Sequence, residues 1–162
     1  MVKITHLAPL PHGYLEAGKE FDEALSELGL SAAFVTWAFD RDINSHVLVI
    51  ITDFLDYAGP YEISKQIFKA YNASALPKSI DPFVIRFFSD KEWIGRAMLK
   101  VTSPELNEEG GAVSENGDYW ITQGLECLYE WIVNKRAKRR RGALEVQKRW
   151  KAFQSNVMLV AA

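Results

Sequence analysis

The apolar positions between residues 46 and 88 predict a strand, a helix and a second strand. Residues 47–51 form an unbroken run of valine, leucine and isoleucine, and residues 83–88 form a second apolar run of strand length. A strand that is apolar on both faces must be covered on both. The segment between the runs has apolar side chains at helical spacing, namely Ile63, Ile67, Ala70 and Tyr71. The pattern predicts a βαβ unit, which is right-handed if its strands are parallel neighbours.

Two further patterns extend this unit towards the N-terminus. Residues 15–28 carry one apolar stripe with most charges off it, which predicts an amphipathic helix that ends at Gly29. Residues 31–39 are rich in strand formers, and the polar segment 40–45 supplies a turn before the strand at 47–53. A short polar loop between two strands predicts an antiparallel hairpin. The central strand then has one antiparallel and one parallel neighbour.

Three more segments are predicted to be helical. Ser89 to Glu92 has the Ser-x-x-Glu form of a capping box, and residues 90–101 continue at helical spacing. Residues 119–133 repeat apolar side chains at intervals of four, three and four, and the same intervals recur after Gly142. The helix after Gly142 carries Trp150 and Phe153 on one apolar face. This face needs to lie on the domain's own sheet or on a second subunit. The residues expected at such an interface are Trp131, Val146, Trp150, Phe153 and Val157.

Together these elements predict an α/β or α+β fold. A small mixed sheet of about three strands with ββαβ connectivity would be covered by helices, including a C-terminal helical pair. The 162 residues are expected to form one domain, with a compact core over 1–133 and a basic helical extension over 134–162. Residues 102–118 are polar, acidic and glycine-bearing, which favours a mobile loop over a functional lid.

Composition excludes several classes of protein. The single cysteine, Cys127, excludes an intrachain disulfide framework and indicates a reducing, cytoplasmic setting as the default. The apolar runs stop well short of the ~20 residues needed to span a bilayer. The N-terminal segment lacks the form of a secretory signal. We therefore expect a cytoplasmic protein with no membrane partner.

The net charge of −2 conceals a division along the chain. Residues 1–133 hold 20 acidic and 10 basic residues, whereas residues 134–162 hold 9 basic residues and one acid, Glu145. The basic residues are Lys135, Arg136, Lys138, Arg139, Arg140, Arg141, Lys148, Arg149 and Lys151. This basic segment, residues 135–151, has three interpretations. It could bind a nucleic-acid partner, it could be a solvated helix end whose cations complement the helix dipole, or it could pair with the acidic first part, within the chain or across a dimer. A pI of about 5.9 argues against a dedicated nucleic-acid binder.

Asp53 and Asp56 are the candidate catalytic residues. They follow the central strand, and ligands tend to bind outside the carboxyl ends of strands in open α/β sheets. Two carboxylates there could hold Mg²⁺ and support phosphoester hydrolysis, or they could simply cap the start of a helix. The sequence contains neither nucleotide-binding glycine motif, no zinc-like spacing of His and Cys, and no GxSxG elbow. No cofactor and no resident metal are therefore expected.

The absence of a catalytic motif favours a non-enzymatic binding or assembly module. Five Trp and nine Phe are many for about three strands to bury, so we expect a homo-oligomer. Two alternatives stay open. One is a nucleic-acid-binding protein that uses residues 135–151, and the other is a metal-assisted phosphoester hydrolase around Asp53 and Asp56.

Overall fold

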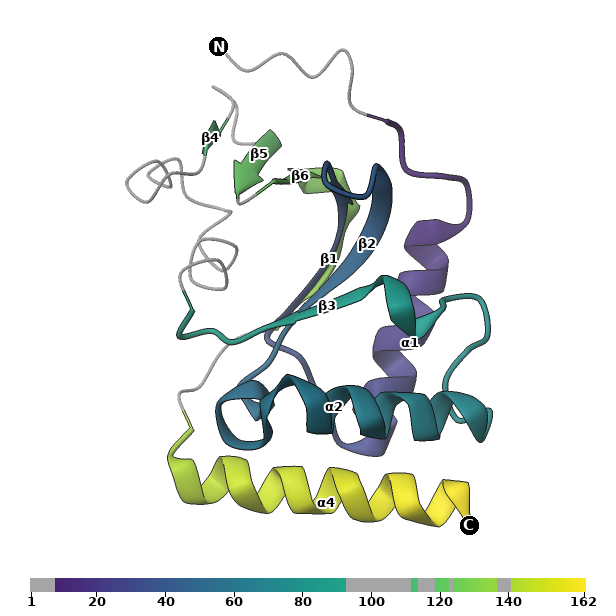
Figure 1. Cartoon of the computed structure of the whole chain (residues 1–162), viewed down its shortest axis with the longest axis vertical. Helices are drawn as coiled ribbons and strands as arrows, with labels where there is room; N and C mark the ends of the chain where they lie inside the picture. Colours follow the sequence, from purple (N-terminus) through teal and green to yellow (C-terminus); the bar gives the residue numbers. More distant parts are fainter. Residues whose placement is uncertain (1–7, 93–111, 114–118, 123, 137–140) are drawn as a thin grey trace.

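The described part of the chain is built around one mixed sheet. A computed structural model describes residues 8–92, 112–113, 119–122, 124–136 and 141–162 (Figure 1). In these residues seven strands form one sheet in the order β3-β2-β1-β6-β5-β4, and β7 also pairs with β1. The strands are β1 (Phe34–Asp40), β2 (Ser45–Ile51), β3 (Ile85–Phe88), β4 (Ala112–Val113), β5 (Tyr119–Thr122), β6 (Leu125–Leu128) and β7 (Ile132–Lys135). The helices are α1 (Tyr14–Leu28), α2 (Phe54–Asn72) and α4 (Ala143–Ala161), with short 3₁₀ helices η1 (Pro82–Val84) and η3 (Tyr129–Trp131).

The predicted ββαβ connectivity is confirmed. β1 and β2 pair antiparallel along their whole length, from Phe34 opposite Ile51 to Asp40 opposite Ser45. β2 and β3 are parallel, and α2 connects them. The mixed α/β class is therefore as predicted. The sheet is larger than the expected three strands because β4 and the three strands within residues 119–135 add to it.

The predicted helix over residues 119–133 is wrong, and so is the C-terminal helical pair to which it belonged. This segment forms β5, β6, η3 and β7, and all three strands join the sheet. β5 and β6 pair antiparallel, with Thr122 opposite Leu125, and Gly124, directly before β6, has a φ of +79°. A positive φ suits glycine and ends any helix. Leu125 and Cys127, two residues apart, are both buried on one face of the sheet.

Two other predictions lie wholly or largely outside the described residues. These are the helix over residues 90–101 and the loop over residues 102–118, of which Ala112–Val113 alone is described, as β4. One hydrogen bond of the predicted capping box is present, since the Ser89 N–H donates to Glu92 Oε1 at 3.2 Å.

The core has one cluster on each face of the sheet. On the first face, β1 and β2 contribute Trp37, Leu48 and Ile50, which pack with buried side chains of α1, α2 and α4. On the second face, the buried side chains are Phe34, Ala38, Val47, Val49, Ile51, Leu125 and Cys127. The continuous apolar run in β2 is thus covered on both faces, as its sequence requires.

The apolar face of α4 lies on the chain's own helices. α4 runs alongside α2 (Figure 1). The Trp150 and Phe153 rings lie 5.5 and 5.8 Å from the ring of Phe54 at the start of α2. Asn156 Nδ2 donates to the Leu28 carbonyl of α1 at 2.9 Å. The sequence left open whether this face covers the sheet or a second subunit; in the structure it covers α2 and α1.

Gly18 lets α1 approach the sheet closely. A Cβ at this position would lie 2.8 Å from Val133 Cγ2 and 2.9 Å from Trp37 Nε1. That indole N–H donates to the Tyr14 carbonyl at 2.8 Å, which ties the first turn of α1 to β1. The helical cost of glycine, about 1 kcal/mol relative to alanine, is therefore accepted here for close packing.

α2 begins well before Ile63, the first apolar position of the predicted helical spacing. A helical turn already starts at Phe54, and the helix is broken at Gly59 with φ 80° and ψ 166°. Thr52 Oγ1 accepts the Phe54 N–H at 3.2 Å and supports this early start. Asp53 and Asp56 consequently stand in a well-defined turn directly after β2. Among the described residues, no helix is long and apolar enough to cross a membrane.

Candidate functional site

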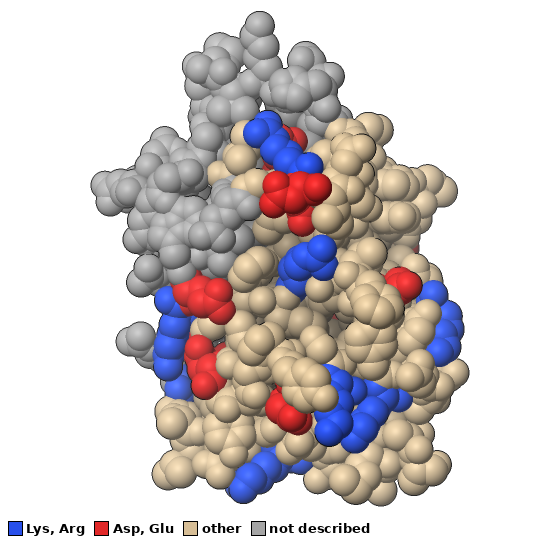
Figure 2. All heavy atoms as spheres, viewed as in Figure 1, with Lys and Arg blue, Asp and Glu red and all other residues tan. Residues whose placement is uncertain are grey.

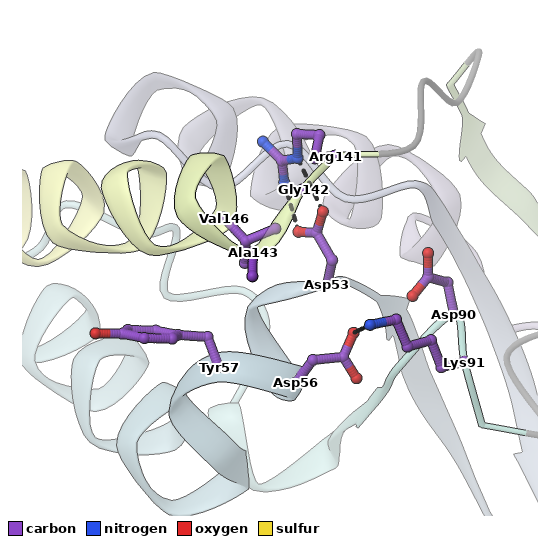
Figure 3. A pocket seen from close by; sticks show the side chains of 9 residues that line it. All are labelled: Asp53, Asp56, Tyr57, Asp90, Lys91, Arg141, Gly142, Ala143 and Val146. Carbon is purple, nitrogen blue, oxygen red and sulfur yellow. Dashed lines mark hydrogen bonds and ion pairs between the residues drawn. The ribbon is translucent and has the colours of Figure 1, made fainter.

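A pocket of about 420 Å³ lies where β2, β3 and α4 meet (Figure 3). Because β2 and β3 are parallel, their carboxyl ends lie at the same edge of the sheet, and the residues after each strand come together there. Arg141, two residues before the first residue of α4, closes a third side. The lining residues are Asp53, Asp56, Tyr57, Asp90, Lys91, Arg141, Gly142, Ala143 and Val146. We call this space the Asp53–Arg141 pocket.

Asp53 is held by a two-pronged ion pair. Arg141 Nε donates to Asp53 Oδ2 at 2.8 Å, and Arg141 Nη2 donates to Oδ1 at 2.5 Å. Both side chains are about four-fifths buried, at 18% and 19% exposure. The guanidinium also lies 5.8 Å from the centroid of the Phe54 ring. The planar fork of arginine matches a carboxylate, so this pair fixes the start of α4 against the end of β2.

Asp56 is held by the segment that follows β3. The Ser89 hydroxyl donates to Asp56 Oδ1 at 2.5 Å, and Lys91 Nζ lies 3.8 Å from Oδ2. Ser89 Oγ also accepts the Lys91 N–H at 3.0 Å, so the serine links the two residues. Asp53 and Asp56, the two predicted site residues, therefore line one pocket, but each is already engaged by a cation.

The pocket has a charged side and an apolar side. In Figure 3 the carboxylates and the Lys91 and Arg141 side chains lie together, while Tyr57 and Val146 lie away from them. Gly142 and Ala143 bring the first turn of α4, with the partial positive charge of its N–H groups, to the wall. In the described part of the chain, no group of three or more His, Cys, Asp or Glu residues is arranged to hold a metal ion.

The basic segment is divided by the structure. Arg136 Nη1 and Nη2 donate to the two carboxylate oxygens of Asp22 at 2.9 and 2.7 Å, so this arginine, like Arg141, has an intrachain acid. Lys135, Lys148, Arg149 and Lys151 are exposed, and Arg149 Nε lies 3.5 Å from Glu145 in the same helix. Lys138, Arg139 and Arg140 lie outside the described residues.

The five residues predicted at an interface are all buried within this chain. Four of them are on α4 and pack against α2 and α1, and Trp131 in η3 packs against the ring of His46 at 5.5 Å. They are Trp131, Val146, Trp150, Phe153 and Val157, with exposures from 0% to 7%. Their apolar surface is therefore already covered inside one copy of the chain.

Cys127 and His46 are titratable groups outside the pocket. Burial, assisted by the negative charge of Glu126, raises the pKa of the Cys127 thiol far above its usual value, so Cys127 is not an activated nucleophile. Burial lowers the pKa of His46, and a hydrogen bond to the Ala8 carbonyl partly opposes this shift. Neither group belongs to the candidate site.

The sequence identified only part of this site. Asp90 and Lys91 were not singled out, although they follow the second strand of the predicted βαβ unit and parallel strands end at the same edge. For Arg141 the sequence leaves open an external anion, a solvated helix end and pairing with the acidic first part. No local signal connects it to Asp53, which is 88 residues away.

Comparison of the chain with models of protein families, with curated proteins and with solved structures finds no match in any of the three. The functional assignment therefore depends on the geometry of the pocket.

Proposed function

We propose that this chain is a non-enzymatic binding module that holds a small charged ligand in the Asp53–Arg141 pocket. One observation carries the proposal. The pocket lies at the carboxyl ends of two parallel strands and combines ionised side chains of both signs with an apolar wall. Small-molecule sites are concave, have volumes of roughly 300–1,000 Å³, and place a few polar groups among apolar ones. The 420 Å³ pocket fits this description.

The lining favours a ligand that has an ionic group and an apolar part. A ligand anion can approach Arg141, Lys91 and the first turn of α4, and a ligand cation can approach Asp53 or Asp56. Because both acids are already in ion pairs, the ligand adds to these pairs or exchanges with one of them. Tyr57 and Val146 offer contact area to its apolar part.

The contacts around the pocket support binding rather than catalysis. The Ser89 hydroxyl donates to Asp56, which resembles a nucleophile beside a base, but Ser89 is only 2% exposed and does not line the pocket. A nucleophile must reach its substrate. Asp53 and Asp56 serve here as partners of cations that hold three chain segments together.

Filling the pocket tests the proposal. Ala143→Trp places a large ring in the pocket, and Leu144→Trp places the same ring on the neighbouring, 82% exposed position outside it. A library of small charged fragments would be screened by ligand-observed NMR against the wild type and both variants. We expect fragments that bind the wild type and Leu144→Trp but not Ala143→Trp. Absence of any binding fragment, or binding that persists in Ala143→Trp, would overturn the proposal.

A metal-assisted phosphoester hydrolase is the second candidate, favoured by Asp53 and Asp56 lining the same pocket. It would require Mg²⁺ to displace Arg141 and Lys91 from these acids. Thermal unfolding with and without MgCl₂ tests this candidate. The binding module predicts no change in melting temperature, whereas a rise that disappears in Asp53→Asn would favour the hydrolase.

Two further candidates are nucleic-acid binding through residues 135–151 and self-association. Within the described ranges, each is supported by fewer exposed residues than the sequence suggested. Among the described residues, the first could use the exposed Lys148, Arg149 and Lys151 of α4. The second would need apolar residues other than the five buried in the core, such as the exposed Met158 and Leu159. Light scattering measures the oligomeric state directly.

A further inference from the structure

Two aromatic side chains stand out on the surface. Tyr61 of α2 and Phe83 of η1 are 74% and 76% exposed, the highest values for large aromatic residues in the described part of the chain. The Phe83 ring contacts the ring of Phe68 on α2, with 5.0 Å between centroids and an edge-to-face angle of 63°. Exposed rings on rigid elements gain little from folding, so a binding role is a reasonable expectation.

Lysines accompany these rings along α2. Tyr61, Lys65 and Phe68 are spaced i, i+4 and i+7, which places them on one stripe, opposite the buried Ile63 and Ile67. Lys69 lies beside this stripe. A helix rises 1.5 Å per residue, so residues 61 and 69 lie about 12 Å apart along its axis. This length is several times the ~3.4 Å spacing of phosphate charges along one strand of duplex DNA, so the stripe is long enough to contact more than one phosphate.

Two more cations lie near these elements, one at Phe83 and one at the end of α2. Arg86 Nη1 donates to the Phe83 carbonyl at 3.0 Å, and Lys78 Nζ lies 3.9 Å from the centroid of the Tyr71 ring. Basic side chains gather over α2 and the connector that follows it (Figure 2). We call this the α2–η1 surface; its residues are Tyr61, Lys65, Phe68, Lys69, Lys78, Phe83 and Arg86.

Two of these cations, Lys65 and Lys69, form no ion pair with the acids of the described residues. Asp81 Oδ1 accepts the Phe83 N–H, and Asp40 Oδ2 lies 4.0 Å from Arg86 Nη2. Glu62 also lies on α2, half-buried. Lys65 and Lys69 are exposed, and within the described ranges neither makes an ion pair. They are therefore available to an anionic partner.

We infer that the α2–η1 surface binds single-stranded nucleic acid. Tyr61 and Phe83 would stack on unpaired bases while Lys65 and Lys69 contact phosphates, which is the combination that sequence-tolerant single-strand binders use. A duplex offers no free base face for stacking. A membrane-surface helix would carry a continuous apolar face, whereas here lysines separate the rings. This surface shares no residue with the Asp53–Arg141 pocket, so the inference is independent of the proposed function.

The test is fluorescence anisotropy with a labelled single strand of thymidine, across a salt series. Removing one stacking ring is expected to weaken binding about tenfold for Tyr61→Ala and for Phe83→Ala. Leu144→Ala and Met158→Ala remove exposed apolar side chains of similar exposure elsewhere and should leave affinity unchanged. Lys65→Ala/Lys69→Ala should weaken binding and flatten the salt slope, whereas Lys148→Ala/Lys151→Ala on α4 should not.

Three results would overturn the inference. The first is failure of the wild type to bind the single strand at low salt. The second is binding of the ring variants as tight as that of the wild type, and the third is a loss of affinity in the α4 lysine variant as large as in the α2 lysine variant. Binding to anionic phospholipid vesicles but not to the single strand would assign the surface to a membrane and equally overturn it. Because all the substituted side chains are exposed, circular dichroism should show that each variant keeps its fold.

Discussion

Arg136 and Arg141 each bind one aspartate that is distant in the sequence. Arg136 bridges β7 to α1 through Asp22 and also donates to the Ala32 carbonyl and the Ser26 hydroxyl, both at 2.9 Å. Arg141 joins the start of α4 to Asp53. Pairing of the basic segment with the acidic first part was one interpretation of the sequence, and it accounts for these two residues.

Asp22 is expected to depend on Arg136. Asp22 is 3% exposed, so Arg136→Met leaves a buried carboxylate with Asn134 as its remaining side-chain donor. We expect the free energy of unfolding to fall by about 3 kcal/mol, the lower end for a broken buried pair, because Arg136 is partly exposed. Urea denaturation measures this loss. Lys148→Met, an exposed control, should change stability by no more than about 0.5 kcal/mol, and an equally small loss for Arg136→Met would contradict the prediction.

His46 should make stability sensitive to mildly acidic pH. Its ring packs against Phe39 and Trp131, with centroids 5.2 and 5.5 Å away, and its Nε2 contacts the Ala8 carbonyl. Because burial lowers its pKa below 6.5 in the folded chain, the unfolded chain takes up this proton first. The contribution of His46 is therefore complete above about pH 6.5 and is lost as the pH falls towards the folded pKa.

Urea denaturation between about pH 5 and pH 7.5, the range in which an imidazole titrates, checks this prediction. His46→Phe should flatten the decline in stability on the acidic side, whereas His12→Gln, at an exposed position, should leave it as in the wild type. An unchanged pH profile in His46→Phe would show that other groups cause the decline.

At the scale of elements, the patterns that depend on burial predicted structure well. The predicted elements are present in the structure. They are β2 and β3 at the continuous apolar runs, α1 at the amphipathic stripe and α4 at the four-three-four spacing. The same spacing failed over residues 119–133. There the β-branched and aromatic residues and the turn at Gly124 favour strands, and β1 offered an unpaired edge for β6 and β7. Periodicity alone could not weigh that tertiary pairing.

α4 is expected to be part of the core and not an appended helix. Phe153 is fully buried against Phe54 and Trp150. Phe153→Ala should therefore lower the free energy of unfolding by about 3–5 kcal/mol through lost burial and the cavity left behind. Urea denaturation at several protein concentrations measures it. Because the contact lies within one chain, the loss should not depend on concentration; a loss that does would indicate an intermolecular interface.

At the scale of the whole molecule, three segments far apart in the sequence build one pocket. The turn after β2, the turn after β3 and the start of α4 meet at one edge of the sheet (Figures 1 and 3). The first two could be brought together from sequence, because a βαβ unit with parallel strands places them there. The third could not, since the position of α4 depends on its packing against α2. The sequence therefore indicates that the residues after β2 and β3 come together, but not that Arg141 lines the same pocket.

The most direct test of the binding proposal is an amide chemical-shift map recorded with the best fragment from the screen. The pocket predicts that the largest shifts fall on amides from all three segments, near Asp56, Lys91 and Ala143, and that they disappear in Ala143→Trp but persist in Leu144→Trp. Shifts confined to the exposed face of α4, or equal in the two variants, would contradict a ligand site at the carboxyl ends of β2 and β3.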